Sequence, residues 1–153
     1  MGSFFRKNIL FVSACIGLII LDSVTKWLAE IFLSSPLSVI KGIFQLSLSH
    51  NTGVAFGIPI PNIIITGLIP FFIAFVIWLF RKNFNFTDSI TKWSLTFILA
   101  GSLGNFINRL WIQSVTDFIA FLFWPSFNLA DAYITIGFFL IFVFYGRIAG
   151  SKN

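Results

Sequence analysis

Long apolar stretches alternate with short polar connections along the chain of 153 residues. A helix needs about 20 apolar residues to cross a bilayer, and four stretches approach or exceed that length. They cover residues 9–33, 60–80, 93–110 and 129–145. The pattern predicts a single membrane domain, residues 1–153, built as a bundle of four transmembrane helices. Two longer connections, 34–59 and 111–128, then emerge on the same side of the membrane.

The two longer connections differ in pattern. From Phe44 to Ser49, apolar and polar residues alternate, which predicts a strand with one apolar face. The second connection contains the apolar segment IAFLFWP, which is too short to span and ends at Pro125. We expect a loop or short helix at the membrane interface there. The predicted fold is therefore an all-α membrane protein with a small external β element.

The composition agrees with a membrane protein. Hydrophobic residues make up 58% of the chain and charged residues only 10%, more apolar surface than a soluble domain of this size can bury. The net charge of +5 comes mostly from residues on one side of the predicted bundle: Arg6, Lys7, Arg81, Lys82, Lys92, Arg147 and Lys152. The positive-inside rule places this side, with both termini, in the cytoplasm. The basic charge thus indicates topology, and no nucleic-acid partner is expected.

Two classes of site are unfavourable from the residue counts alone. A single cysteine, Cys15, excludes a disulfide framework, and one histidine with five acidic residues offers few ligands for a metal. We expect no metal and no cofactor. The first apolar stretch is too long for a cleaved signal sequence, and we expect it to remain as an anchor.

An acid and a base interrupt the first apolar stretch. Asp22 and Lys26 lie one helical turn apart and can pair, because an unpaired ion at membrane depth costs several kcal/mol. Such a pair can clamp two helices together or support a functional site, and both interpretations remain open. A nucleophile pair formed by Ser23 and Lys26 is a weaker alternative, since Lys26 already has Asp22 as a partner.

The third stretch ends in a polar stripe at three- and four-residue spacings. The stripe consists of Gly101, Gly104, Asn105, Asn108 and Arg109. Glycines allow close helix contact and asparagines bond across it, so packing explains most of the stripe. The guanidinium of Arg109 also needs an anion or water, and the candidate partners are Asp117, Asp131 or a substrate carbonyl.

Two aspartates flank the second connection. Asn128 is placed to cap the fourth helix, and Asp131 falls in its first turn, where the helix dipole favours a negative charge. Asp117 has no such explanation among its apolar neighbours. Both ends of the connection return to one membrane face, so the two carboxyl groups can meet and share a proton. A carboxylate beside a carboxylic acid can activate water and protonate a leaving group, which is acid–base hydrolysis of an amide.

Five motifs, in order along nearly the whole chain, resemble those of the lipoprotein signal peptidase (signal peptidase II) family of intramembrane aspartic proteases. They are LDSVTK, HNTGVAFG, GNFINR, VTDF and FNLADAYITIG. The resemblance implies a four-helix bundle with an external β-cradle. It implies that Asp117 and Asp131 are the catalytic dyad. It also implies substrate-binding or supporting roles for Asn51, Gly53, Asn105, Arg109, Asn128 and Ala130, and for Asp22 and Lys26. Asn108 departs from the family, in which aspartate is common, so the pairing of Arg109 can differ here.

The family resemblance also implies the partners and the location. The substrate is a diacylglyceryl-modified prolipoprotein, cut just before its lipidated cysteine to release the signal peptide. The enzyme would lie in the bacterial cytoplasmic (inner) membrane among lipids, as a monomer, with the active site near the external face. From the residues alone, a small transporter or ion relay using Asp22, Lys26 and Arg109 is the alternative.

Overall fold

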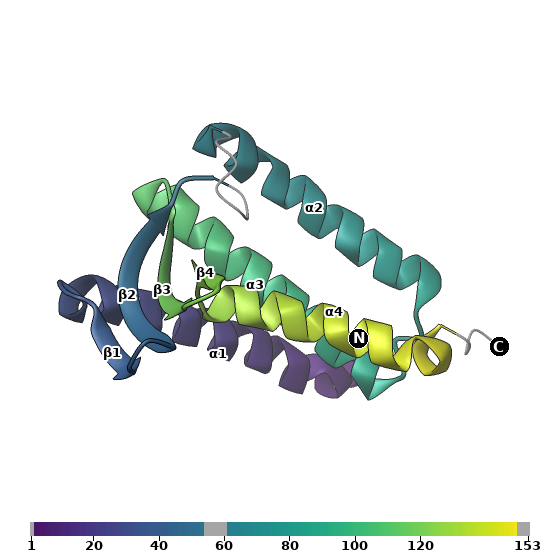
Figure 1. Ribbon diagram of the computed structural model, residues 1–153. Helices are drawn as coiled ribbons and strands as arrows, with labels where there is room; N and C mark the ends of the chain where they lie inside the picture. The colour runs from purple at the N-terminus through teal and green to yellow at the C-terminus, as the bar shows by residue number, and fades with distance from the viewer. Residues whose placement is uncertain (1, 54–60, 150–153) are drawn as a thin grey trace.

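The computed structural model describes residues 2–53 and 61–149, with side chains from residue 8 onward. Helices and strands follow in the order α1 (Gly2–Phe32), β1 (Leu37–Ile40), β2 (Phe44–Asn51), α2 (Asn62–Asn83), α3 (Ser89–Ile112), β3 (Val115–Phe121), β4 (Trp124–Phe127) and α4 (Leu129–Ile148) (Figure 1). The four helices coincide with the four apolar stretches, although α1 begins earlier and α4 ends later than the hydropathy pattern predicts.

Helix α3 is the centre of the bundle and contacts α1, α2 and α4. Glycines permit the closest approaches. A Cβ atom at Gly101 would collide with the carbonyl oxygen of Ala130 on α4, and one at Gly137 would lie 2.6 Å from Ile98 Cγ1. A Cβ at Gly104 would lie 2.6 Å from an Asp22 carboxylate oxygen on α1. The predicted close-packing role of Gly101 and Gly104 is therefore confirmed.

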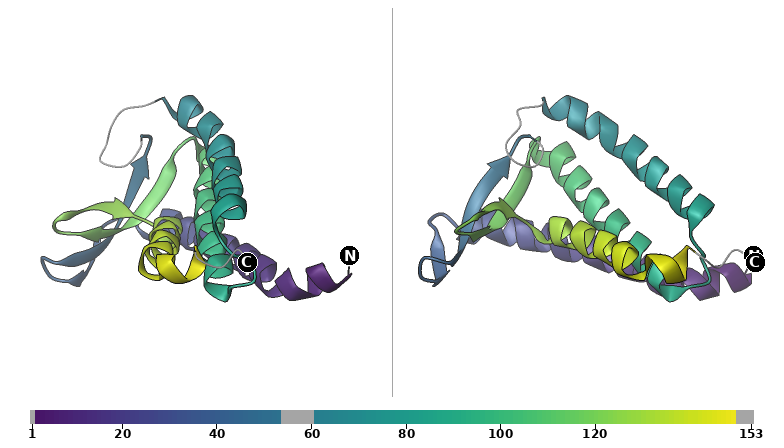
Figure 2. Two further views of the ribbon diagram at one scale, coloured as in Figure 1. Left: turned by 90° about the vertical axis from the view of Figure 1, so that its right-hand side faces the viewer. Right: turned by 45° about the vertical axis from the view of Figure 1, so that its right-hand side comes forward.

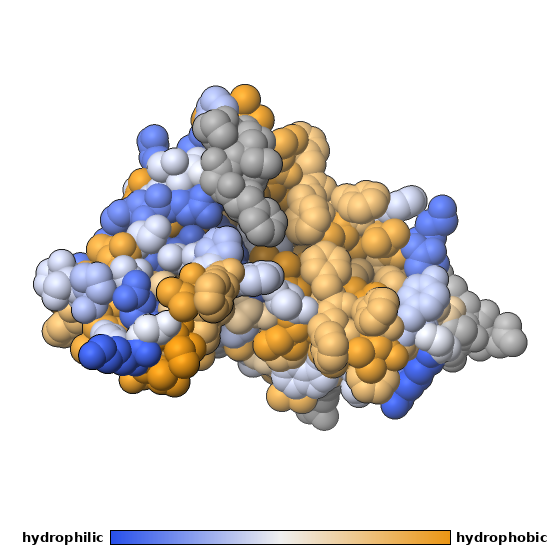
Figure 3. Space-filling model, viewed as in Figure 1, coloured by the Kyte–Doolittle hydropathy of each residue, from blue (hydrophilic) through white to orange (hydrophobic). Residues whose placement is uncertain are grey.

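Three of the described helices are long and apolar enough to cross a membrane: residues Asn8–Phe32 of α1, α2 and α4. They expose most of their apolar side chains, such as Phe71 (74% exposed) and Phe142 (83% exposed). Figure 3 shows an apolar region over the helices, with hydrophilic residues toward both ends of the molecule. Burying this surface in lipid removes its contact with water, so the chain is a multi-pass membrane protein.

Helix α3 is long enough to cross a membrane but is not as apolar as the other three helices. Polar residues occur along much of its length and face the neighbouring helices. Its buried polar residues are Thr91, Ser94, Thr96, Ser102 and Arg109. The hydroxyls of Ser94 and Thr96 donate to carbonyl oxygens one turn back in the same helix, which satisfies them inside the bundle. A crossing by α3 thus stays a prediction.

The external element is an antiparallel four-stranded sheet in the order β1-β2-β3-β4. The predicted strand from Phe44 is confirmed as β2. The expectation of a loop or helix at IAFLFWP is wrong, because this segment forms the hairpin of β3 and β4. Backbone pairing of β3 with β2 stabilises the extended conformation, and Pro125 is tolerated because β4 is an edge strand.

The sheet lies at one end of the bundle, and α1 begins and α4 ends at the other (Figure 2). At this second end, an apolar core is formed by Val76, Phe80, Phe84, Ile98 and Ile148. Asp88 caps α3 there by accepting from the Ile90 amide at 2.7 Å and also pairs with Arg147 at 2.9 Å. The core and this cap join α2, α3 and α4 to one another at the end opposite the sheet.

Candidate active site

The two candidate catalytic aspartates meet where the sheet joins the bundle. Asp117 is the third residue of β3, and Asp131 is in the first turn of α4. The hairpin of β3 and β4 reverses the chain and returns it to the start of α4 beside β3. This arrangement brings both carboxyl groups to one residue, Asn128, whose side chain donates to Asp117 and whose backbone N–H donates to Asp131.

Asn128 is the N-cap residue of α4 and is fully buried. Its Oδ1 accepts from the backbone N–H of Asp131 at 3.0 Å, and its own N–H donates to Asp131 Oδ2 at 3.3 Å. These reciprocal bonds form a capping box, which confirms the predicted cap. The remaining amide group of the side chain donates from Nδ2 to Asp117 Oδ1 at 2.6 Å.

Asp117 is 3% exposed, although it lies in a strand of an external sheet. Asn51 Nδ2 approaches its other oxygen, Oδ2, at 3.4 Å from the end of β2. Burial, and then the charge of Asp131, raise the pKa of Asp117 to about 6, even though bonds from Asn128 and Asn51 oppose the shift. A carboxyl group with this pKa can hold or release a proton near neutral pH.

A chain of polar contacts crosses the bundle to Asp131. Asp22 Oδ2 pairs with Lys26 Nζ at 2.7 Å, and the same ammonium donates to Asn105 Oδ1 at 2.8 Å. Asn105 Nδ2 then donates to Asp131 Oδ1 at 2.8 Å. The buried ion pair on α1 is thus connected to the candidate site through a single amide, which favours the supporting role over a simple clamp.

Asp22, on α1, also accepts a hydrogen bond from the backbone of Ala130. Asp22 Oδ1 accepts from the backbone N–H of Ala130 at 2.9 Å, one residue before Asp131. This N–H belongs to the first turn of α4, where backbone donors lack partners within the helix. The carboxylate therefore fixes the start of α4 from the side of α1.

Arg109 binds neutral oxygens. Its Nη2 donates to the carbonyl oxygen of Gly53 at 2.7 Å, and its Nη1 donates to Asn62 Oδ1 at 3.0 Å. None of the ion pairs within residues 8–53 and 61–149 includes this guanidinium. Gly53 is held further by its N–H, which donates to Asn51 Oδ1 at 3.0 Å. Arg109 thus connects Gly53, just after β2, to Asn62 at the start of α2.

Asn108 has a contact of its own. Its Oδ1 accepts from the backbone N–H of Thr116 at 2.7 Å, which ties β3 to α3 one residue before Asp117. A carboxylate would accept the same bond, so the amide preserves this geometry while removing a charge. The two neighbours bind different elements: Asn108 binds β3, whereas Arg109 binds Gly53 and the start of α2.

Sequence reasoning missed two residues of this region, Asn62 and Thr116. Asn62 follows Pro61 at the start of an apolar stretch, a position at which a helix cap is the usual explanation. Thr116 directly precedes Asp117 in the VTDF motif. Both residues lie next to segments that the sequence assigns to the site, and this proximity is the signal that could have identified them. Their partners are 47 and 86 residues away along the chain, beyond the reach of local patterns.

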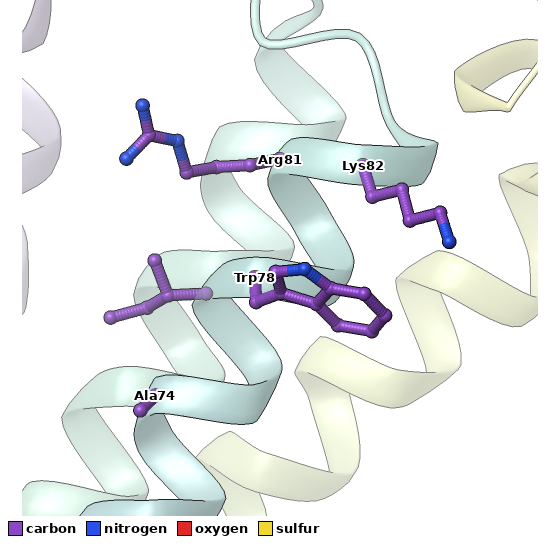
Figure 4. A pocket seen from close by; sticks show the side chains of 5 residues that line it. Ala74, Trp78, Arg81 and Lys82 are labelled. Carbon is purple, nitrogen blue, oxygen red and sulfur yellow. The ribbon is translucent and has the colours of Figure 1, made fainter.

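Other features of the described residues lie apart from this site. No group of three or more His, Cys, Asp or Glu side chains suited to a metal occurs in the described part of the chain. A shallow hollow of about 550 Å³ lies at the far end of α2, where Ala74, Trp78 and Arg81 line it (Figure 4). Lys82 lies there over the Trp78 ring, 5.0 Å from its centroid. This end of the helix is opposite the sheet.

Comparisons with known proteins agree with the motifs. Residues 14–146 match the family model described as "Signal peptidase (SPase) II". The lipoprotein signal peptidase of Aquifex aeolicus is 34% identical over 158 aligned residues, covering 95% of this chain and 91% of the relative. That of a Sulfurihydrogenibium species is 36% identical, with 86% and 88% covered.

Solved structures give the same result for the fold. One described as a bacterial membrane enzyme has a TM-score of 0.74 and 26% identity, covering 90% of this chain and 88% of that one. A second bacterial membrane enzyme structure, at 23% identity, has a TM-score of 0.71 and shares the fold. The chain therefore belongs to the signal peptidase II family, the peptidases that remove signal peptides from prolipoproteins.

Proposed function

We propose that Asp117 and Asp131 form the catalytic dyad of this peptidase. The observation that supports the proposal best is the contact of Asn128 with both residues, which holds two buried or half-buried acids at one place. Two carboxyl groups in a poor dielectric resist ionising together, so one proton is shared between them. This is the protonation state that acid–base hydrolysis requires.

The proposed reaction is hydrolysis of the peptide bond before a lipidated cysteine. The ionised carboxylate takes a proton from water, whose oxygen attacks the peptide carbonyl carbon, while the protonated carboxyl donates to the carbonyl oxygen. Collapse of this intermediate breaks the C–N bond: the amine leaves with the proton that the base took from water, and a hydroxyl of the intermediate returns its proton to the other carboxylate. The raised pKa of Asp117 supports its role as the initial proton donor, with Asp131 as the base. The two sites titrate as a pair.

The other polar residues hold this dyad. Lys26 and Asn105 orient Asp131 from the bundle side, while Asn51 contacts Asp117 from β2. Arg109 holds Gly53, whose N–H in turn donates to Asn51, the residue that contacts Asp117. All of these groups come from one chain, so a monomer suffices for the chemistry.

We also propose the topology and the substrate. If α3 crosses the membrane with the other three helices, the sheet and dyad lie at the external face of the cytoplasmic membrane. The basic residues Arg81, Lys82, Lys92 and Arg147 then lie at the cytoplasmic end, as the positive-inside rule requires. A diacylglyceryl-modified prolipoprotein is anchored in the same bilayer and can reach a site at this depth by lateral diffusion.

The test compares single carboxyl-to-amide variants of the purified full-length protein. A diacylglyceryl-modified prolipoprotein is the substrate, and release of its signal peptide is measured. We expect Asp117→Asn and Asp131→Asn each to lower the rate at least about 100-fold, because acid–base catalysis contributes that much or more. Asp88→Asn, at the opposite end of the bundle, is the control and should retain near-normal rates. Wild-type activity in either dyad variant, with helical content retained, would refute the proposed dyad.

A further inference from the structure

We propose that Glu30 is a positioning residue that aligns Asp117 through Thr116. Glu30 Oε1 accepts from the Thr116 hydroxyl at 2.7 Å and lies 2.8 Å from His50 Nε2. The two partners are directly opposite each other on β3 and β2. One carboxylate on α1 therefore joins both strands that contain contacts of the dyad. The inference rests on the proposed role of Asp117 in catalysis.

The position of Glu30 on α1 extends the line of charged residues already described. Asp22, Lys26 and Glu30 follow at four-residue intervals, so they share one face of the helix. Asp22 and Lys26 reach the start of α4 and Asn105, respectively. Glu30 lies one turn nearer to the sheet and reaches β2 and β3 instead. The same helix face thus holds Asp131 through Asn105 and Asp117 through Thr116.

Strand geometry explains how a contact outside the dyad can set its alignment. Neighbouring residues in a strand point to opposite faces, so Thr116 and His50 face α1 while Asp117 and Asn51 face the site. Thr116 is fully buried, and its backbone N–H is held by Asn108 on α3. The residue is therefore fixed at two atoms, from two helices. Releasing its hydroxyl allows β3 to rotate or shift beside Asp117.

The two contacts of Glu30 differ in how much they contribute to the stability of this region. The side chains of His50 and Glu30 are 47% and 34% exposed, and an ion pair at such exposure contributes little. The Thr116 hydroxyl is shielded from water and has this carboxylate as its acceptor. The alignment of Asp117 therefore depends mainly on the bond between Glu30 and Thr116, and His50 is a secondary contact.

The experiment measures kcat, KM and pH profiles for prolipoprotein cleavage by full-length variants, normalised to folded protein. We expect Glu30→Ala and Thr116→Val each to lower kcat about 10- to 100-fold, since a displacement of about 1 Å costs up to about 100-fold. KM should change less than about threefold, because the substrate contacts remain. The double variant should be no slower than the slower single variant, because both remove one contact. The falling limb of the pH profile should move in both variants, because the pKa of Asp117 depends on its burial and on the bonds from Asn128 and Asn51.

Conservative substitutions provide the matched controls. Glu30→Gln keeps an oxygen acceptor and Thr116→Ser keeps the hydroxyl, so both should remain within about threefold of wild type. Independent, multiplying effects of Glu30→Ala and Thr116→Val would overturn the inference, as would equal losses in Glu30→Gln and Glu30→Ala or an unshifted pH profile. Normal cleavage by Glu30→Ala beside an inactive Asp117→Asn overturns this inference alone. Normal cleavage by Asp117→Asn overturns the proposed dyad.

Discussion

Asn128 donates a 2.6 Å hydrogen bond from Nδ2 to Oδ1 of Asp117, although the two residues belong to different elements. The donor is the cap of α4, and the acceptor is in the middle of the external sheet. The geometry of the site therefore depends on where a helix begins. An amide is well suited to this position because it offers an acceptor to the helix and a donor to the carboxylate.

Replacing Asn128 by aspartate should separate the capping of α4 from the hydrogen bond to Asp117. Asn128→Asp keeps an acceptor for the Asp131 amide, so the unfolding temperature in acid, where the new carboxyl group is protonated, should stay close to that of the wild type. It also puts a carboxylate oxygen where a donor faced Asp117, and cleavage should fall at least about 100-fold at neutral pH. Asn128→Ala loses the cap as well and should be about 1 kcal/mol less stable. Near-normal cleavage by Asn128→Asp would contradict this role of the amide.

The pH profile of cleavage should report the shared proton. Because the pKa of Asp117 is raised to about 6, kcat/KM should fall as the pH rises through about 6, where the dyad loses its second proton. A bound substrate excludes water and disfavours the charged form further, so the corresponding limb of kcat should lie at higher pH. A second step at low pH is expected from the first ionisation. Steady-state rates between about pH 4 and pH 9 test this, and a profile with a single step speaks against a shared proton.

The same pKa shift predicts how Asp117 affects stability. The folded protein binds this proton more tightly than the unfolded chain does, so the contribution to stability is complete below about pH 4 and is lost as pH rises through about 6. A shift from 3.8 to about 6 corresponds to about 3 kcal/mol. Asp117→Asn should therefore raise the unfolding temperature at pH 8 and have little effect at pH 4.

Asp88 provides a control, because its pKa is shifted in the direction opposite to that of Asp117. Burial raises its pKa, but bonds from the Ile90 amide and from Arg147 outweigh burial and leave the pKa below its ordinary value. Asp88→Asn should lower the unfolding temperature at pH 8, and this loss should diminish in acid. Thermal unfolding in detergent at both pH values measures the two variants together. Equal responses of Asp117→Asn and Asp88→Asn to pH would contradict the assignment.

The close approach of α3 and α4 should be sensitive to one methyl group. Gly101→Ala would push against the carbonyl oxygen of Ala130, and overpacking of this kind costs about 1–3 kcal/mol. Because Ala130 adjoins Asp131, cleavage should fall too. Gly17→Ala is the matched control on an exposed part of α1 with nothing within 4 Å, and it should be neutral or stabilising. Thermal unfolding and cleavage rates of both variants are the measurements. Equal behaviour of the two would show that the contact is loose.

Much of the bundle could be predicted from the sequence because helix signals are local. Apolar length located the four helices, and the position of Asn128 before an apolar run identified the cap of α4. The strand β2 was also predicted, since its apolar and polar residues alternate. The hairpin of β3 and β4 was missed, because IAFLFWP lacks that alternation and its extended form depends on pairing with β2.

The site was predicted unevenly for the same reason. Asp117 and Asp131 stand out as rare acids in apolar sequence, and motif order adds their neighbours. The contacts between Glu30 and Thr116 and between Arg109 and Asn62 depend on how distant elements meet. Arg109 was expected to bind an anion, water or a substrate carbonyl, and two of its donors instead bind a backbone carbonyl and a side-chain amide oxygen of the same chain. Such long-range pairings are decided by packing, which no local pattern encodes.

The capping box of α4 has a consequence for the working enzyme. Asp131 secures the first turn of its helix with the same carboxylate that is proposed to accept a proton from water. A neutral acid is a poorer acceptor than its anion, so each protonation would weaken the tie to the Asn128 amide. Turnover would then briefly loosen the helix start and tighten it again when the proton departs. Architecture and reactivity share one side chain, and neither can be altered without disturbing the other.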